Sequence, residues 1–183
     1  GGEIEGVHDR GDWDLSNHGK YSGKDLSYFD DPPAGGPPAG GKKRFIPHII
    51  ETSAGAERNF LAFLSDAYEE IKGGRTKTTE AAKETEVILR LHKDLAPIKV
   101  AVLPLLKNKK ELVKKAREVY DLIKPHFMTL YDESGTIGRR YRRQDEIGTI
   151  FCLTLDFDSL KQNDLTIRDR DTMKQERVKI EEL

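Results

Sequence analysis

Strand-like and helix-like segments alternate through the second half of this chain, and that alternation most restricts its fold. Residues 100–103 form a short, continuous apolar run, which is typical of a strand buried on both faces. Apolar residues then recur at helical spacing until Pro125 ends the segment; they are Leu112, Val113, Ala116, Val119, Tyr120 and Ile123. A strand followed by a helix predicts the first half of a crossover connection.

The same alternation continues towards the end of the chain. A strand, a helix and a third strand are expected over residues 127–131, 137–147 and 150–157. Residues 165–168 and 177–180 flank a turn at Asp171–Thr172 and predict a terminal hairpin. This order predicts a compact α/β domain whose strand–helix–strand connections are right-handed.

The first half of the chain has a different pattern. Residues 45–51 are β-branched and apolar, and they predict a strand. A helix is expected from about Ala56 until Gly73–Gly74 ends it. Residues 75–95 are polar and then partly helical, and we place a domain boundary at Ala96–Pro97.

A tandem Pro-Pro-Ala-Gly-Gly repeat occupies residues 32–41. It has no large side chain and cannot bury apolar surface, so it is interpreted as an extended surface insertion without a function. A docking site for a domain that binds proline motifs is the alternative.

Composition excludes several classes of protein. No apolar run among the 183 residues approaches the roughly 20 needed to span a bilayer, and no charged-then-apolar leader opens the chain. We therefore expect a soluble protein without a membrane partner. The single cysteine, Cys152, lies among apolar residues, is expected to be a small core residue and suits a reducing cytosol. The five histidines show no ligand spacing, which argues against a zinc site.

Charge is unevenly distributed although the formal net charge is −1. Residues 1–41 carry eight acidic and three basic side chains, whereas residues 106–146 carry eleven basic and seven acidic ones. A polyanion would prefer the second block, and a solvated helix face is the alternative. Within it, the run Arg139, Arg140, Tyr141, Arg142 and Arg143 suits phosphate contact and base stacking. Ion pairing with the acidic residues that follow is the alternative.

The segment from Glu51 to Arg58 joins the predicted strand to the predicted helix through small residues. Small residues let a ligand approach the backbone, and helix N-termini bind anions. An arginine in the first helical turn opposes the helix dipole, so Arg58 favours an anion beside it. A nucleotide or amino-acid pocket and an ordinary capped turn both remain open.

Near the start of the chain, charged and aliphatic residues alternate from Glu3 to Val7. This pattern places Glu3 and Glu5 on one face of a short strand. Paired carboxylates can hold a divalent metal or serve in acid–base chemistry, and a solvent-facing edge strand is the alternative.

Several separated motifs resemble the dimeric glycyl-tRNA synthetases, which are class II aminoacyl-tRNA synthetases. Residues 50–58, Ile-Glu-Thr-Ser-Ala-Gly-Ala-Glu-Arg, are similar to motif 3 of this family. Residues 3–7, 9–10, 14–15 and 21–26 are similar to the strand and loop that precede motif 3. Four later segments are similar to the C-terminal anticodon-binding domain of the family: residues 95–100, 135–141, 145–149 and 165–173.

The resemblance implies a fold and a domain organisation. Residues 1–72 would be the last part of the antiparallel-sheet catalytic domain, interrupted by the repeat at residues 32–41. Residues 73–95 would form a connector. Residues 96–183 would form the anticodon-binding domain, an α/β domain with a mixed sheet flanked by helices.

The resemblance also implies a two-step reaction, in which glycine and ATP give glycyl-adenylate and pyrophosphate before the glycyl group passes to glycine tRNA. Glu3 would hold Mg²⁺ against the phosphates, and no catalytic residue is separable from binding. The implied glycine-binding residues are Glu51, Thr52, Ser53, Ala54 and Gly55. The implied ATP-binding residues are Glu3, Ile4, Gly55, Ala56, Glu57 and Arg58. The implied tRNA contacts are residues 139–143.

Two family motifs are not found: motif 1, which forms the dimer, and motif 2, which holds the α-phosphate of ATP. We therefore expect a partial chain of a longer, cytoplasmic, homodimeric enzyme, and expect the fragment alone to be inactive. The alternative is a non-catalytic relative of class II synthetases that binds tRNA or another nucleic acid.

Overall fold

A computed structural model describes residues 2–30, 43–75 and 85–183. The Pro-Pro-Ala-Gly-Gly repeat predicted to be a surface insertion lies outside the described residues. The chain forms two compact units, Gly1–Leu61 and Ala62–Leu183, and helix α2 begins in the first and ends in the second. The predicted boundaries at residues 72 and 96 are not decided by these units and stay a prediction.

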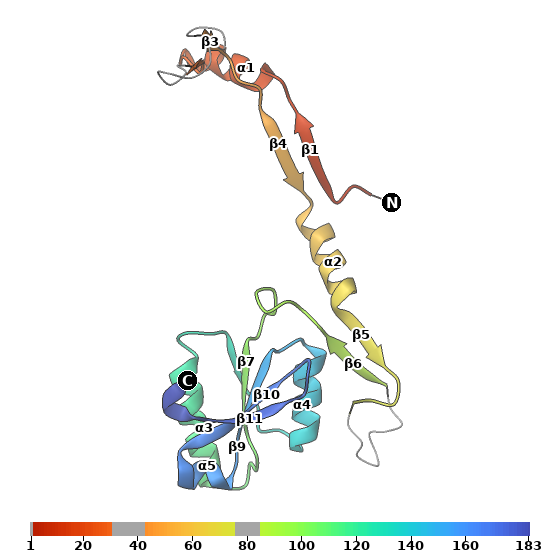
Figure 1. Cartoon of the computed structure of the whole chain (residues 1–183), viewed down its shortest axis with the longest axis vertical. Helices are drawn as coiled ribbons and strands as arrows, with labels where there is room; N and C mark the ends of the chain where they lie inside the picture. Colours follow the sequence, from red (N-terminus) through yellow and green to blue (C-terminus); the bar gives the residue numbers. More distant parts are fainter. Residues whose placement is uncertain (1, 31–42, 76–84) are drawn as a thin grey trace, which may run out of the picture. The chain divides into compact units, whose positions relative to one another are not determined.

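The described part of the first unit consists of two short antiparallel ribbons, one whole helix and the beginning of a second (Figure 1). Strand β1 pairs with β4, and β2 pairs with β3. The elements are β1 (Glu5–Asp9), α1 (Trp13–Ser22), β2 (Tyr28–Asp30), β3 (Lys43–Phe45), β4 (Ile50–Ala54) and the start of α2 (Ala56–Ala67).

The second unit holds a two-stranded hairpin and a five-stranded mixed sheet with the order β11-β10-β9-β7-β8. Strands β7, β8 and β9 are parallel, whereas β10 and β11 are antiparallel additions at one side. The elements are β5 (Tyr68–Ile71), β6 (Glu86–Leu89), β7 (Val100–Pro104), α3 (Lys110–Ile123), β8 (Thr129–Tyr131), α4 (Ile137–Glu146), β9 (Phe151–Leu155), α5 (Phe157–Gln162), β10 (Asp164–Asp169), β11 (Gln175–Lys179) and a terminal 3₁₀ turn (Ile180–Glu182).

Helices α3 and α4 cover opposite faces of this sheet. The chain moves from β7 to β8 on one side and then returns across β7 to β9 on the other, so two crossovers of the same hand put their helices on opposite faces. Val102 and Leu153 point towards α3, where Ala116 and Val119 are buried. Every residue of β7 is buried, which explains its uninterrupted apolar sequence. The predicted α/β fold with a mixed sheet is confirmed.

The helix predicted to reach Gly73 ends earlier, at Ala67. Residues Tyr68–Ile71 form β5, which pairs in antiparallel register with β6. The backbone N–H of Arg90 donates a hydrogen bond to the Ala67 carbonyl oxygen at 2.6 Å, at the point where the helix gives way to the strand. Pairing with a strand distant in sequence therefore overrides the local helical spacing.

Three other local predictions differ from the structure. The strand expected over residues 45–51 is divided between β3 and β4, because Pro47 interrupts it and lacks the N–H needed for a ladder. The described part of residues 75–95 contains strand β6 and no helix. Helix α5 was not expected because it has only six residues, and a capping box at Asp156 and Ser159 starts it.

The prediction that Cys152 is a core residue is confirmed. Its side chain is buried in β9 beside Ala101 and Leu103, and burial raises the pKa of the thiol to about 12. Such a thiol stays protonated and unreactive at neutral pH. Within the described residues, no helix combines the length and the apolar character needed to cross a bilayer.

The pairing of Asp156 with Arg177 makes stability depend on pH. Hydrogen bonds from Arg177 lower the pKa of Asp156 from 3.8 to about 2. A carboxylate whose pKa is lowered by folding stabilises the fold above its unfolded pKa and loses that contribution as the pH falls through the folded value. We expect the urea midpoint of the chain to fall between about pH 4 and pH 2, and Asp156→Asn to flatten this dependence. Asp158→Asn, on the same helix but outside the ion pair, should leave the dependence unchanged.

Candidate functional site

Strands β1 and β4 bring two of the predicted glycine-binding residues, Glu51 and Ser53, onto one face. In their register Gly6 lies opposite Ser53 and His8 lies opposite Glu51. Directly opposite residues share a face of an antiparallel pair, and alternate residues along each strand do the same. Gly6, His8, Glu51 and Ser53 therefore lie on one face of the ribbon, which we call the polar face. Thr52 and Ala54 lie on the other.

Glu3 also reaches the polar face, although it precedes β1 rather than belonging to it as expected. Its carboxylate oxygen Oε1 lies 3.8 Å from Nε2 of His8. A Cβ atom added at Gly6 would come within 2.6 Å of that oxygen and 2.3 Å of the His8 nitrogen. Gly6 thus leaves the room in which these two side chains meet.

Arg10 is the partner of Glu51, a role that the sequence reasoning did not assign. Its Nη1 atom lies 3.2 Å from Oε2 of Glu51, and its Nε donates a hydrogen bond to Oδ2 of Asp14 at 2.7 Å. The hydrogen bond from Arg10 lowers the pKa of Asp14, and that pair raises the pKa of Arg10. No local sequence signal indicates the pair of Arg10 and Glu51, because the two residues are 41 positions apart.

Arg58 lies in the first turn of helix α2, and its side chain contacts the beginning of the chain. Its Nη1 atom donates a hydrogen bond to the backbone carbonyl oxygen of Glu3. A hydrogen bond of 3.1 Å from the Gly55 N–H to the Ile4 carbonyl oxygen closes the same contact. The structure therefore brings together residues that the sequence places 51 and 55 positions apart and that the resemblance assigns to ATP.

The remaining predicted residues fall into two groups. Ala56, Glu57 and Arg58 form the exposed first turn of α2, so the N–H groups of that turn are available to an anion. Thr52 and Ala54 are exposed on the face opposite Glu51. Of the predicted glycine-binding residues, only Glu51 and Ser53 share the polar face with Glu3.

In the second unit, the loops that follow the three parallel strands meet at one edge of the sheet. Parallel strands end together, and ligands of open α/β sheets bind at this carboxyl edge. The loop after β7 contains Lys107 and Lys109, and the loop after β8 leads into the first turn of α4. This edge therefore places Lys107 and Lys109 on the same side of the sheet as the beginning of α4, together with Asp132 and Glu133 of the loop after β8.

The five residues 139–143 do not share one environment. Arg139 is exposed in the first turn of α4, and in the part of the chain that the structure describes its guanidinium makes no ion pair. Arg143 donates hydrogen bonds to Asp132 at 2.5 and 3.2 Å. Tyr141 donates to or accepts from the Thr154 hydroxyl at 2.6 Å, and burial raises its pKa. Arg142 donates to the Thr85 carbonyl oxygen at 2.7 Å.

Arg140 corrects the expectation that this run faces RNA as a whole. Its side chain is 1% exposed and donates hydrogen bonds to carbonyl oxygens of Pro104, Leu105, Asp132 and Thr136. An arginine with four backbone acceptors fixes the loops at the carboxyl edge rather than meeting solvent. The prediction of tRNA contact is therefore kept for Arg139 and is not kept for Arg140.

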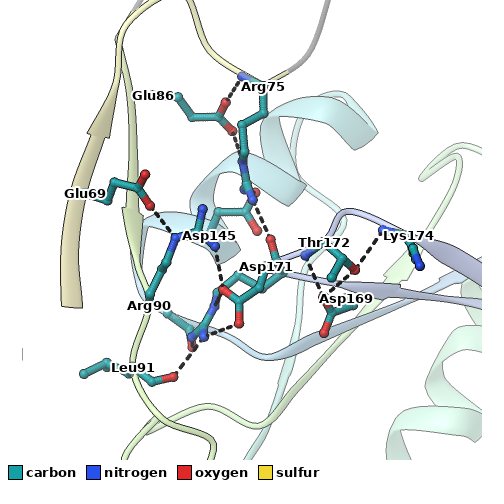
Figure 2. Close-up of polar contacts among 12 residues, drawn as sticks. Glu69, Arg75, Glu86, Arg90, Leu91, Asp145, Asp169, Asp171, Thr172 and Lys174 are labelled. Carbon is teal, nitrogen blue, oxygen red and sulfur yellow. Dashed lines mark hydrogen bonds and ion pairs between the residues drawn. The ribbon is translucent and has the colours of Figure 1, made fainter.

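Asp145 is the centre of a buried network of ion pairs, drawn in part in Figure 2. Its two carboxylate oxygens accept hydrogen bonds of 2.8 and 2.9 Å from Arg168 on β10. Arg75 adds a third hydrogen bond of 2.6 Å. The side chains of Asp145 and Arg168 are 1% and 3% exposed. Charges this deeply buried are retained only when they are paired.

The sequence of residues 99–183 matches a family described as an anticodon binding domain. The matched range covers the mixed sheet, its helices and the terminal hairpin. The expectation of an anticodon-binding domain in this part of the chain is confirmed.

The whole chain is similar to part of several glycine–tRNA ligases. It is 48% identical over 182 residues to the ligase of Thermobifida fusca and 50% identical over 184 residues to that of Clostridium acetobutylicum. These alignments cover 100% of this chain and 37% and 36% of the two relatives, so the chain spans about a third of their length. The family resemblance stated from the motifs is confirmed. A prolyl-tRNA synthetase structure from Cryptosporidium parvum aligns with a TM-score of 0.49 and 22% identity, over 52% of this chain and 21% of that one.

We predict that removing a buried carboxylate of this network lowers the free energy of unfolding much more than removing an exposed one. Asp145→Ala would leave Arg168 and Arg75 without their shared anion in a buried position, and should lower the free energy of unfolding by about 3–5 kcal/mol. Asp121→Ala, which removes an exposed partner of Lys124, should have little effect. Urea unfolding followed by circular dichroism would measure both, and equal small effects would contradict the assignment.

Proposed function

We propose that this chain works as the C-terminal part of a glycine–tRNA ligase. Two findings support this: the chain carries an anticodon-binding domain, and along its whole length it is similar to about a third of each ligase compared. In the whole enzyme it would take part in ATP-dependent activation of glycine and transfer of the glycyl group to glycine tRNA. The observation that carries the proposal is the position of Glu3, Glu51, Ser53 and Arg58 on the β1–β4 ribbon and the helix that follows it.

On the polar face, Glu51 is suited to bind the ammonium group of glycine. Its carboxylate is half-buried and is held from one side by Arg10, which leaves its other oxygen to accept hydrogen bonds from an ammonium group. Ser53 lies two residues along the same face. The close spacing of the Glu51 carboxylate and the Ser53 hydroxyl favours a small amino acid as ligand. An amino acid with a larger side chain would have to displace one of these two groups.

Arg58 and the first turn of α2 are suited to the nucleotide. A guanidinium at a helix N-terminus adds its charge to the free backbone N–H groups, which together attract phosphate. In the structure Arg58 is exposed and bonded only to a carbonyl oxygen among the described residues, a partner that an anion can displace. Neutralising negative charge as pyrophosphate leaves is the contribution this side chain would make to the activation step.

Glu3 fits a role beside Mg²⁺ bound to ATP. Its side chain is 66% exposed and stands on the polar face near Arg58. Proteins commonly hold this ion through one or two carboxylates while phosphate oxygens and water supply the remaining ligands. The ion would supply charge neutralisation of the phosphates.

The second face of the β1–β4 ribbon supports the proposal that this unit belongs to a larger catalytic sheet. Val7 and Ile50 lie on that face and are 66% and 61% exposed. Phe60 on α2 is 67% exposed. Val7 and Ile50 share their face with Glu5 and Asp9, and large apolar side chains exposed on a ribbon and the helix after it are often covered by another part of the fold. The remaining strands of a ligase would cover them, and we further propose a homodimer in the cytoplasm for that complete enzyme.

The carboxyl edge of the mixed sheet is the proposed anticodon-binding surface. It combines the exposed Arg139 with the lysines of the loop after β7. A non-catalytic nucleic-acid-binding relative would use the same surface, and the retained Glu51 and Arg58 favour the ligase over that alternative.

The activation step is tested in the complete protein that contains this chain. Glycine-dependent exchange of pyrophosphate into ATP is expected, and Arg58→Ala should lower its rate about 100-fold because a charge-neutralising donor is lost. Arg44→Ala removes an exposed arginine of the same unit that pairs with Asp25, and should leave the rate unchanged. Exchange that is absent from the unaltered protein would favour the non-catalytic alternative.

The surface proposed for tRNA makes a separate prediction. Arg139→Gln should weaken binding of glycine tRNA and reduce the slope of log affinity against log salt by about 1, as expected for one lost phosphate contact. Lys174→Gln, an exposed cation in the turn between β10 and β11 at the opposite edge of the sheet, serves as the control. Equal effects of the two substitutions would place the binding surface elsewhere.

A further inference from the structure

The hairpin β5–β6 leads from helix α2 to the anticodon-binding domain. Strand β5 starts at Tyr68, the residue directly after the end of α2, so no loop separates the two elements. After β6 the chain continues into the domain. The hairpin is thus the covalent route between the segment that resembles motif 3 and the domain that would hold tRNA.

Arg75, which follows β5, binds the hairpin to two elements of the domain (Figure 2). Its Nη2 atom donates a hydrogen bond to Oδ2 of Asp145 on α4 at 2.6 Å, and its Nη1 donates to the Arg170 carbonyl oxygen at 2.5 Å. Its backbone N–H donates to Glu86 of β6 at 2.6 Å. The side chains of Arg75 and Glu86 are 10% and 8% exposed, so water competes little for these contacts.

Arg90, directly after β6, makes a second connection. Its Nε atom donates to Glu69 on β5, and its Nη1 donates to Oδ1 of Asp171 in the β10–β11 turn at 3.0 Å. Hydrogen bonds from Arg170 and Arg90 lower the pKa of Asp171. A further hydrogen bond has its donor in the domain: Arg170 donates to the Leu91 carbonyl oxygen, which follows the hairpin, at 2.9 Å.

Apolar packing between the hairpin and the domain is centred on β6, which lies against α4 and whose Ile88 is fully buried. A cleft of about 600 Å³ lies beside the hairpin, between the end of α2, the segment after β6 and the domain, and is lined by Phe63, Leu91, Leu95 and Phe151 among others. Three of these side chains, Phe63, Leu95 and Phe151, are 54%, 50% and 41% exposed. Close backbone approach occurs at Gly148, where an added Cβ would lie 3.1 Å from the Leu89 carbonyl oxygen. The orientation of the hairpin therefore depends on directional polar contacts as well as on the burial of Ile88.

We propose that Arg75 and Arg90 are positioning residues for tRNA charging, which hold the β5–β6 hairpin in one orientation on the anticodon-binding domain. The inference rests on the proposed function. A tRNA molecule held at its anticodon presents its acceptor end to the active site only if the path between the two regions is rigid. A planar guanidinium that donates to several acceptors holds the elements it joins in one orientation better than a lysine ammonium group does, because each of its hydrogen bonds has a fixed direction.

The test uses the complete protein and separates the two steps of the reaction. In Arg75→Met, glycine-dependent pyrophosphate exchange should stay within about twofold of the unaltered protein, because no group that meets glycine or ATP has changed. The kcat for charging of glycine tRNA should fall about tenfold, within the usual range of coupling between sites. The KM for tRNA should change little, since the anticodon-binding surface is intact. Arg90→Met should give the same pattern, and Arg75→Lys should recover part of the kcat.

Arg177→Met is the matched control. Arg177 also joins two carboxylates, Asp156 and Asp164, but both lie within the anticodon-binding domain and away from the hairpin. Its loss should lower stability without lowering the ratio of charging to exchange. A normal charging kcat in Arg75→Met, or a parallel fall of exchange and charging, would overturn the positioning role. Absence of exchange in the unaltered protein would instead overturn the proposed function.

Discussion

The buried carboxylate of Asp145 is the interaction on which the second unit depends. It accepts hydrogen bonds from Arg168 on β10 and from Arg75 beside the hairpin, and α4 carries it. Three elements distant in sequence therefore share one anion. Removing two positive charges from water is unfavourable, and the Asp145 carboxylate offsets that cost together with Glu86, whose carboxylate oxygen Oε1 lies 3.7 Å from Nε of Arg75. This requirement fixes α4 against β10 and sets where the hairpin lies on the domain.

The candidate ligand site in the first unit depends on strand register. Residues directly opposite in β1 and β4 place Glu51 and Ser53 with Gly6 and His8, and place the apolar Val7 and Ile50 on the other face. A slip of one residue would exchange the two faces and separate Glu51 from Glu3. The contacts of Arg58 with Glu3, and of Gly55 with Ile4, support the proper register from the start of α2.

The sequence predicted the strongly periodic elements well. The apolar run of β7 and the repeated apolar face of α3 were identified because burial alone explains those patterns. The sequence predicted a helix for residues 68–71, and this prediction is wrong. These residues pair with residues 86–89, and no local sequence pattern indicates a pairing with so distant a strand. Arg140 was grouped with a surface run for a similar reason. Its acceptors include carbonyl oxygens of residues 104 and 105, and its burial follows from them.

By itself, the sequence determined the α/β class, the order of the elements in the anticodon-binding domain and the motifs shared with glycyl-tRNA synthetases. These properties depend on residue spacing, which is local and can be read along the chain. Only the tertiary structure decided which charges are buried, which of residues 139–143 meets solvent and how Arg75 and Arg90 join the hairpin to the domain. Those properties depend on hydrogen bonds between residues up to 95 positions apart, and their partners exist only once the chain has folded.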